Sequence, residues 1–202
     1  MKTPSQDAYD LIAKWEGFSP TWYTDSAGVE TIGYGLTRPL LDTVNIADVE
    51  GPITETEGRV LLKAVVTQHF APKMARSLDR GRAQQEIDAC TSLAYNIGVG
   101  TFQNSTLVRH YNAGNADKAA QEFLKWVYIT DPQTGEKKVL DGLVRRRRDE
   151  KALAQEAEPM VEASEITKAE RVPVVDIEPV ADIESVIESV PGEVDVPSDL
   201  HA

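Results

Sequence analysis

An abrupt change in composition near Gln155 limits how much of this chain can fold around a core. Residues 1–154 contain 20 acidic and 19 basic residues, whereas residues 155–202 contain 13 acidic residues and only two basic ones. The later segment also has five prolines and no aromatic residue. Sequence of this kind cannot bury enough apolar surface to offset the entropy lost on folding. We therefore predict a folded domain over 1–154 and a disordered acidic tail over 155–202.

Capping residues mark the start of the first helix. Thr3 is predicted to cap it, with Pro4 at its first position and Gln6 completing a capping box. Gly17 is the expected stop. Between these signals, apolar side chains recur at helical spacing at Ala8, Leu11, Ile12 and Trp15. Glu16 is therefore expected at the end of this helix, at the edge of its apolar face.

A second capping box, Thr54 and Glu57, opens a longer helix. We expect this helix to run toward Leu78 with a break at Pro72, and to join an N-terminal lobe to a C-terminal one. Further helices are predicted from apolar stripes over 83–97, 106–112, 116–127 and 143–154.

The segment between the first two helices has a different pattern. Residues 25–28, Asp-Ser-Ala-Gly, are typical of a turn, and residues 31–35 are predicted to form a short strand with glycines at Gly33 and Gly35. We expect a small β-hairpin there, and mostly loop over 36–51. Residues 130–142 are predicted to form a polar turn or hairpin.

Several classes of site are disfavoured by the residues present. Cys90 is the single cysteine, so no intrachain disulfide is expected, and it is predicted to be a buried structural thiol. The three histidines have no metal-ligand spacing, and we expect no metal and no cofactor. Arg145–Arg148 is the one basic run in an acidic protein, so nucleic-acid binding is disfavoured. This run is expected either to attract an anionic surface or to pair with nearby acidic residues such as Asp149 and Glu150.

The N-terminus does not resemble a secretion signal, because Asp7, Asp10 and Lys14 interrupt its apolar residues. No run of about 18 apolar residues predicts a membrane span. We therefore expect synthesis in the cytosol without stable membrane insertion.

Glu16 and Asp25 have the properties that hydrolysis of a sugar–sugar bond requires. That reaction needs one protonated carboxylic acid and one carboxylate that stays charged. Glu16 lies between Trp15 and Phe18, and apolar surroundings favour the neutral acid. Asp25 lies in a polar turn, which favours the charged form, and the Thr31 hydroxyl is placed to hold a water.

The same carboxylates also fit a purely structural interpretation, as a glutamate at a helix end and an aspartate that caps a turn. Glu30 is assigned no catalytic role, because it precedes Thr31 and is expected on the opposite face of the strand. Gly33 and Gly35 would let an extended polymer approach the hairpin, and at most one of Trp22, Tyr23 and Tyr34 is expected to stack on a sugar.

The longer pattern resembles the phage-type lysozymes, the endolysins of glycoside hydrolase family 24. It consists of Glu16, Asp25 and Thr31 at the spacing E-x8-D-x5-T, followed by IGYG. The similarity continues in the family's order with SLAYNIGVGTF (92–102), STLVRHYNAG (105–114), EFLKWVY (122–128) and GLVRRRRDEKAL (142–153). The resemblance implies an α+β, mostly α, two-lobed lysozyme-like fold. Its N-terminal lobe, about 1–52, would hold the small β-hairpin sheet, with a connecting helix over about 53–80 and a helical C-terminal lobe over about 81–154.

The resemblance also implies roles for single residues. Glu16 matches the general acid, Asp25 the second catalytic carboxylate and Thr31 the threonine that positions a water. Gly33, Tyr34 and Asn96 fall where substrate is expected to bind. Leu36 departs from the pattern, because many members have a histidine there with a structural, charge-pairing role.

The implied activity is hydrolysis of the β-1,4 bond between N-acetylmuramic acid and N-acetylglucosamine in peptidoglycan, which lyses a bacterial host. The partner is peptidoglycan, the protein is expected to be a monomer, and it would leave the host cytoplasm for the cell wall through a holin-type membrane lesion. Two alternatives stay open: a lytic transglycosylase, in which one glutamate acts without an attacking water, and a non-catalytic wall-binding protein.

Overall fold

The structure, a computed structural model, describes residues 2–25, 28–46, 48–79, 81–130 and 134–156. The acidic tail predicted to be disordered over 155–202 therefore lies outside the described residues, apart from Gln155 and Glu156. Gln155 is the last residue of helix α9 (Asp141–Gln155), so this helix extends one residue past the predicted end of the domain.

Helices make up most of the described chain. The first half contains α1 (Gln6–Glu16), β1 (Ser19–Thr24), β2 (Glu30–Gly33), β3 (Leu36–Thr37), α2 (Arg38–Asp42), α3 (Glu55–Val65), the π-helical turn η1 (Val66–Phe70) and α4 (Ala71–Ser77). The second half contains α5 (Gln84–Ile97), α6 (Val99–Gln103), α7 (Thr106–Asn112), α8 (Ala116–Glu122), the 3₁₀ turn η2 (Phe123–Lys125), β4 (Tyr128–Thr130), β5 (Lys137–Val139) and α9. The predicted α+β, mostly α fold class is confirmed. Among the described residues, no helix has both the length and the apolar character needed to cross a membrane.

The first helix begins later than its sequence predicts. Ser5, not Thr3, is its N-cap, and the Ser5 hydroxyl accepts a hydrogen bond from the Asp7 N–H. The same hydroxyl donates to Asp88 Oδ2 at 2.6 Å, and the Ser5 N–H donates to Asp88 Oδ1 at 2.8 Å. A buried carboxylate needs such donors, and Asp88 on α5 is fully buried. A long-range contact that is not visible in the local sequence therefore decides where α1 starts.

The second capping box is confirmed. The Thr54 N–H donates to Glu57 Oε2 at 2.7 Å, and the Glu57 N–H donates to Thr54 Oγ1 at 3.2 Å. The predicted break at Pro72 is replaced by a change of helical type. Through η1 the backbone widens, so that the Ala71 N–H bonds to the Val66 carbonyl five residues back, and the helical path continues into α4.

The small sheet has the order β1-β2-β3, with both pairs antiparallel. Tyr23 lies opposite Thr31 in the β1–β2 pair. The prediction of loop over 36–51 was wrong at its start, because β3 and α2 form there. Thr37 caps α2, and Leu36 and Leu41 are buried in the core, which stabilises a segment with weak local signals.

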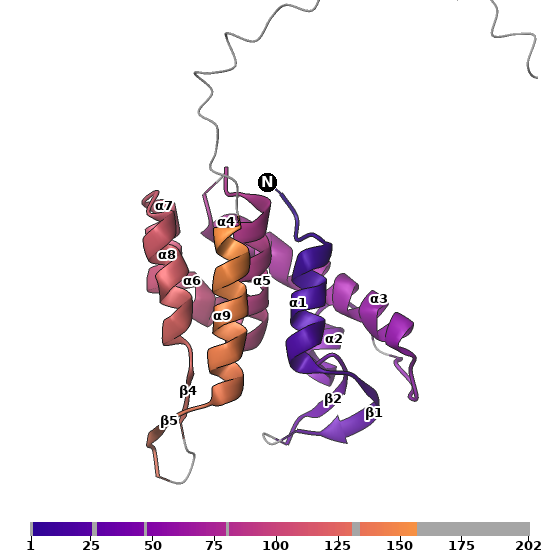
Figure 1. The fold of residues 1–202 in the computed structure, drawn as a ribbon. Coiled ribbons are helices and arrows are strands. Elements are labelled where there is room, and N and C mark those ends of the chain that lie inside the picture. The colour runs from indigo at the N-terminus through magenta and orange to yellow at the C-terminus, as the bar shows by residue number, and fades with distance from the viewer. Residues whose placement is uncertain (1, 26–27, 47, 80, 131–133, 157–202) are drawn as a thin grey trace, which may run out of the picture. The chain divides into compact units, whose positions relative to one another are not determined.

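One hydrophobic cluster connects the sheet with the helices. Helix α1 packs against both α3 and α5. Ile12, Leu62 and Leu93, one from each helix, are fully buried in that cluster. Figure 1 shows the result: β1 and β2 lie with α1 and α3 on one side of the molecule, and α5 to α9 lie on the other. Cys90 is also buried there, and burial raises the pKa of its thiol, as expected for a structural cysteine.

Candidate active site around Glu16

Glu16 is the last residue of α1, where the helix ends at Gly17. Its carboxylate is not in the apolar setting that the flanking residues predict. Oε1 accepts a 2.7 Å hydrogen bond from Arg146 Nη1, and the side chain is 21% exposed. The flanking aromatic side chains contact other groups: Phe18 packs against Tyr34, and the Trp15 indole donates a hydrogen bond to Asp149. An ion pair, and not an apolar pocket, therefore orients this carboxyl group.

Arg146 is itself held by buried partners on α5 and α9. Its Nε donates to Glu150 Oε1 at 3.2 Å, and its Nη2 donates to the Ser92 carbonyl at 3.3 Å. The Ser92 hydroxyl donates to the same Glu150 oxygen at 2.7 Å. Burial raises the pKa of Glu150, and the two neighbouring arginines and Ser92 act in the opposite direction. Three helices are thus joined at the Glu16 carboxylate.

The basic run divides into a buried pair and an exposed pair. Arg146 and Arg147 are buried, whereas Arg145 and Arg148 are exposed. Arg147 lies 3.1 Å from Glu150 and donates to Asn96 Oδ1 at 3.0 Å; burial lowers its pKa to about 10. The pairing alternative therefore describes the two inner arginines, while the outer two remain on the surface.

Gly35 lets the turn after β2 lie directly against Glu16. This glycine has φ +76°, and a Cβ at its position would lie 3.0 Å from Glu16 Oε2. The turn is fixed to α5 because the Tyr95 hydroxyl donates to the Tyr34 carbonyl at 2.8 Å. Gly35 was expected to give room to a polymer, and the structure shows that it gives room to the carboxylate of Glu16.

Asp25 and Thr31 are both fixed to the backbone of Val29. The Val29 N–H donates to Asp25 Oδ1 at 2.9 Å, and the Thr31 hydroxyl donates to the Val29 carbonyl at 3.2 Å. The Asp25 N–H also bonds to that carbonyl at 3.0 Å. Because the Thr31 hydroxyl has used its proton, it can only accept a hydrogen bond from a further group such as water.

Glu30 lies on the other face of the strand, as its position next to Thr31 predicts. It is exposed, and its carboxylate accepts a 2.8 Å hydrogen bond from Arg38 Nε. The Arg38 guanidinium also stacks over the Trp22 ring at 4.1 Å. Glu30 therefore pairs with Arg38 at the surface, and Trp22, partly buried against the core, supports the Arg38 guanidinium.

The remaining predicted substrate-binding residues differ in what they expose. The Tyr34 ring is 4% exposed and belongs to the core, and Gly33 is buried with φ +63°. Asn96 is exposed at the end of α5. Of the three aromatics considered as sugar platforms, Tyr23 has 45% of its surface exposed. Leu36, expected to replace a histidine with a charge-pairing role, is fully buried and apolar.

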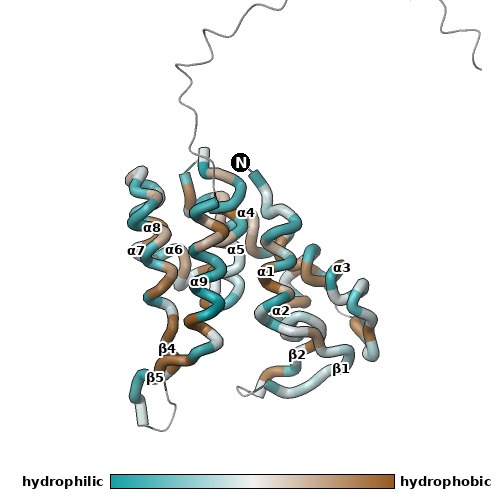
Figure 2. Tube along the Cα trace, viewed as in Figure 1, coloured by the Kyte–Doolittle hydropathy of each residue, from teal (hydrophilic) through white to brown (hydrophobic). Residues whose placement is uncertain are grey.

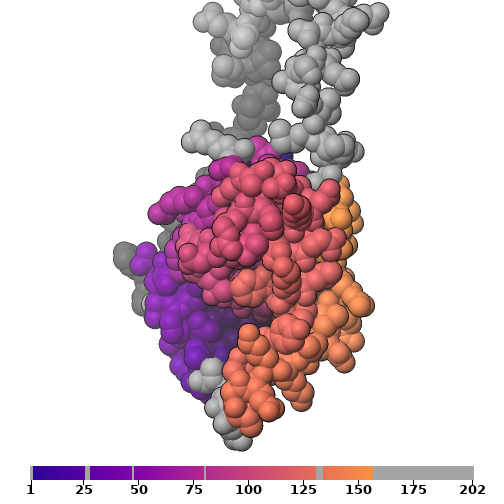
Figure 3. Space-filling view, turned by 90° about the vertical axis from the view of Figure 1, so that its left-hand side faces the viewer, coloured from indigo at the N-terminus to yellow at the C-terminus, as the bar shows by residue number. Residues whose placement is uncertain are grey.

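The surface near these residues is hollowed between the N-terminal segments and the β4–β5 hairpin (Figure 3).

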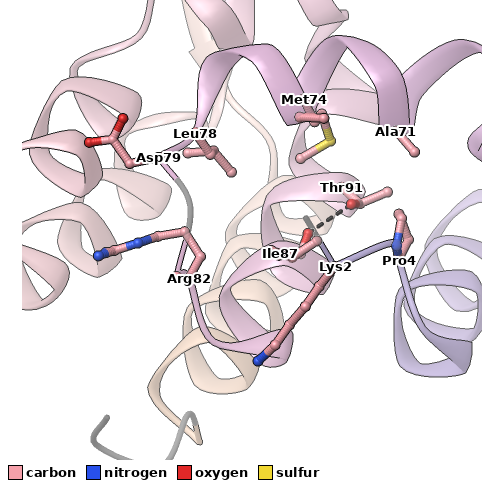
Figure 4. Close-up of a pocket in the computed structure, with 11 residues that line it drawn as sticks. Lys2, Pro4, Ala71, Met74, Leu78, Asp79, Arg82, Ile87 and Thr91 are labelled. Atoms are coloured by element: carbon pink, nitrogen blue, oxygen red, sulfur yellow. Dashed lines mark hydrogen bonds between the residues drawn. The ribbon is translucent and has the colours of Figure 1, made fainter. Parts of the chain in front are cut away.

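A separate small cavity lies between α4 and α5 and is lined by Pro4, Met74 and Arg82 among others (Figure 4). Its volume of ≈ 20 Å³ suits about one water molecule and excludes a sugar. The length of α1, about 16 Å, separates this cavity from Glu16. It therefore belongs to the packing and not to the candidate site.

The sequence did not predict the contacts around Glu16: Arg146 binds it, Glu150 and Ser92 hold Arg146, and Tyr95 fixes the turn at Gly35. One signal was available, because Arg146 and Glu150 are four residues apart on a predicted helix and such pairs meet on one face. That this pair also reaches α1 depends on tertiary packing. Within the described residues, no cluster of His, Cys, Asp and Glu is arranged to hold a metal ion.

Residues 13–150 match the family model described as phage lysozyme. The chain is 35% identical over 153 residues to the endolysin of Acyrthosiphon pisum secondary endosymbiont phage 1, covering 76% of this chain and 98% of that relative. The endolysin from Escherichia coli O157:H7 phage FAHEc1 has a TM-score of 0.64 and 31% identity, covering 78% of this chain and 97% of the other. The muramidase domain of SpmX from Asticaccaulis excentricus has a TM-score of 0.65 and 27% identity, with 76% and 98% covered.

Proposed function

The chain belongs to the phage lysozyme family, and we propose that it cleaves the β-1,4 bond between N-acetylmuramic acid and N-acetylglucosamine in peptidoglycan, so that a bacterial host lyses. Its membership makes it a glycoside hydrolase of the lysozyme type. The observation that carries the finer assignment is the Glu16 carboxylate, oriented by a buried arginine beside a hairpin that fixes Asp25 and Thr31.

In this proposal Glu16 protonates the oxygen of the leaving sugar. A guanidinium only donates hydrogen bonds, so the Oε1 atom that Arg146 binds acts as an acceptor. The transferred proton is therefore carried by Oε2, the oxygen that lies beside Gly35. Arg146 is shared with Glu150, whose negative charge offsets part of the guanidinium charge felt at Glu16.

Asp25 and Thr31 supply the second half of the reaction. Both are fixed to Val29, so their positions relative to each other are set by one short stretch of β-hairpin. A water that donates one hydrogen bond to the Thr31 hydroxyl and a second to the Asp25 carboxylate would be oriented for attack on the sugar. This arrangement favours hydrolysis over a transglycosylase reaction, in which no water attacks.

The test is digestion of purified peptidoglycan with the wild type and with Glu16→Gln. The wild type should release fragments with free reducing ends, and Glu16→Gln should be at least about 1000-fold slower with unchanged thermal unfolding. Anhydro-sugar ends would identify a transglycosylase instead. Binding without any released fragment would identify a wall-binding protein.

We also propose that residues 1–154 form the catalytic unit as a monomer, and that the protein reaches the wall through a holin-type membrane lesion. Expression in a bacterial host should then be tolerated until the membrane is permeabilised. Turbidity recorded with and without chloroform measures this directly. Lysis without permeabilisation would show another route to the wall, and light scattering would reveal a stable oligomer.

A further inference from the structure

The β4–β5 hairpin exposes an unusual share of the large apolar side chains. Six such side chains are exposed in the part of the chain that the structure describes, and three of them lie on this hairpin. They are Tyr128, Ile129 and Val139, exposed by 54%, 42% and 46%. Figure 2 shows these hydrophobic stretches at the base of the hairpin, away from the core. Exposed apolar surface concentrated in one place indicates a contact with another molecule.

Basic side chains accompany these apolar ones. Lys138 lies opposite Ile129 in the hairpin, and Lys137 lies opposite Thr130. Both lysines are exposed, and no ion pair joins either of them to another described residue. Exposed Arg145 follows within the first turns of α9. Both faces of the hairpin therefore combine apolar contact area with positive charge.

The hairpin leads directly into α9, the helix whose Arg146 contacts Glu16. Its base is closed by a 3.0 Å hydrogen bond from the Leu140 N–H to the Val127 carbonyl, and α9 starts at the next residue, Asp141. Arg146 is five residues further on, about 7.5 Å along the helix axis. The hairpin thus extends from the Glu16 end of the molecule, where Figure 1 shows it on the other side from β1 and β2.

We propose that the β4–β5 hairpin is the second wall of the substrate groove and that it binds the acidic peptide stems and a sugar face of peptidoglycan. Tyr128 supplies an aromatic platform for a sugar ring, and Lys137, on the same face of the hairpin, binds a carboxylate of a stem. This inference rests on the proposed muramidase function. It extends that function to a recognition surface that Glu16, Asp25 and Thr31 do not supply.

An anionic membrane surface has similar complementarity, since lysines beside apolar side chains also suit lipid headgroups. The position of the hairpin favours the glycan. The hairpin ends where α9 begins, about 7.5 Å along the helix axis from Arg146, which contacts Glu16. A polymer held at Glu16 must therefore continue past the hairpin. The hollow between the N-terminal segments and the hairpin in Figure 3 gives that polymer a path.

The experiment compares Lys137→Gln with the wild type on soluble, stem-bearing peptidoglycan fragments. At low ionic strength the half-saturating substrate concentration should rise about three-fold with kcat nearly unchanged, because contacts remote from the reacting bond contribute uniform binding. The difference should shrink near 1 M salt, where the screening length is about 3 Å. Lys118→Gln removes the same charge from an exposed site on α8 and should match the wild type.

Tyr128 is tested separately. Tyr128→Ala should raise the half-saturating concentration several-fold, whereas Tyr128→Phe, which keeps the ring, should bind nearly as the wild type does. An inactive wild type would refute the proposed function itself. Unchanged saturation in an otherwise active hairpin variant would refute only the hairpin proposal. The hairpin proposal would also be refuted if a hairpin variant lost binding to vesicles of neutral and anionic phospholipid while its cleavage rate was unaffected. The hairpin would then be a membrane contact.

Discussion

Glu16 Oε1 and Arg146 Nη1 are 2.7 Å apart, although 130 positions separate the two residues in the sequence. The contact joins the end of α1 to α9, and through Glu150 and Ser92 it also reaches α5. The carboxyl group that is proposed to donate a proton is thus positioned by the packing of three helices. Substitutions in α5 or α9, far from Glu16 in the sequence, should therefore alter the reaction.

Arg146→Met should lower both stability and activity, because it removes the donor to Glu16 and one of the two arginines that face the buried Glu150 carboxylate. Losing one member of a buried ion pair costs about 3–5 kcal/mol of unfolding free energy, and the loss should lie at the lower end because Arg147 stays 3.1 Å from Glu150. Arg146→Lys keeps a positive charge beside Glu150, but its single ammonium cannot bind Glu16, Glu150 and the Ser92 carbonyl together as the guanidinium does. We expect chemical denaturation to show a smaller stability loss for Arg146→Lys than for Arg146→Met, whereas fragment release stays low in both. Recovered activity would show that Arg146 serves folding alone.

Gly35→Ala should disturb the Glu16 carboxylate directly. The substitution places a methyl group 3.0 Å from Glu16 Oε2 and also strains a backbone at φ +76°. We expect kcat to fall more than about ten-fold, with a stability loss of about 1–2 kcal/mol.

Gly98→Ala is the matched control for Gly35→Ala. Its φ is +83°, so the backbone strain is similar, but no atom lies within 4 Å of the added Cβ. It should lose similar stability and keep its activity. Equal losses of activity in the two variants would mean that strain, and not the carboxylate contact, explains the effect.

Asp25→Asn and Thr31→Val should reduce kcat by at least about 100-fold while KM changes little, because both residues are proposed to act on the attacking water. Asparagine keeps an oxygen for the Val29 N–H, so the turn is preserved while the charge is lost. Glu30→Gln on the opposite face should stay within about two-fold of the wild type. If KM rises as much as kcat falls, the two residues recognise substrate and do not orient water.

Removing residues 157–202 should leave the unfolding free energy within about 1 kcal/mol, as expected for a proline-containing acidic segment without aromatic residues. This segment contains 12 acidic and two basic residues, so the truncated protein also loses a large negative charge. Its clearing rate on permeabilised cells should rise at low ionic strength, because peptidoglycan is anionic. The difference should fade near physiological salt, where the screening length is about 8 Å. Slower clearing by the truncated protein at every salt concentration would assign the tail a targeting role.

Stability should also fall modestly on acidification through His69. Burial and the neighbouring Lys73 lower the pKa of His69 below its usual 6.5. The unfolded chain therefore takes up a proton first as the pH drops, and the folded state loses stability below about pH 6.5. Melting temperatures at pH 8 and pH 5.5 should differ less for His69→Gln than for the wild type. The same pH dependence in both proteins would contradict this assignment.

Much of the fold could be predicted because its signals are local. The Thr54–Glu57 capping box, the helix over 106–112 and the turn chemistry at Asp25 each depend on residues within one or two turns of chain. The spacing of Glu16, Asp25 and Thr31 likewise identified the family, because motifs in a fixed order can be read directly from the sequence. The short elements β3 and α2 were missed because their apolar residues are stabilised by distant parts of the core.

The surroundings of Glu16 were decided by the tertiary structure alone. The sequence neighbours Trp15 and Phe18 predicted an apolar pocket for the Glu16 carboxylate, but adjacent side chains on a helix point in different directions. The groups that contact the carboxylate come instead from Arg146 on α9 and from the turn at Gly35. The sequence determined which residues are proposed to carry the chemistry and which helices and hairpin present them. Packing decided which charges meet, because contacts between distant segments depend on how helices stack and not on local pattern.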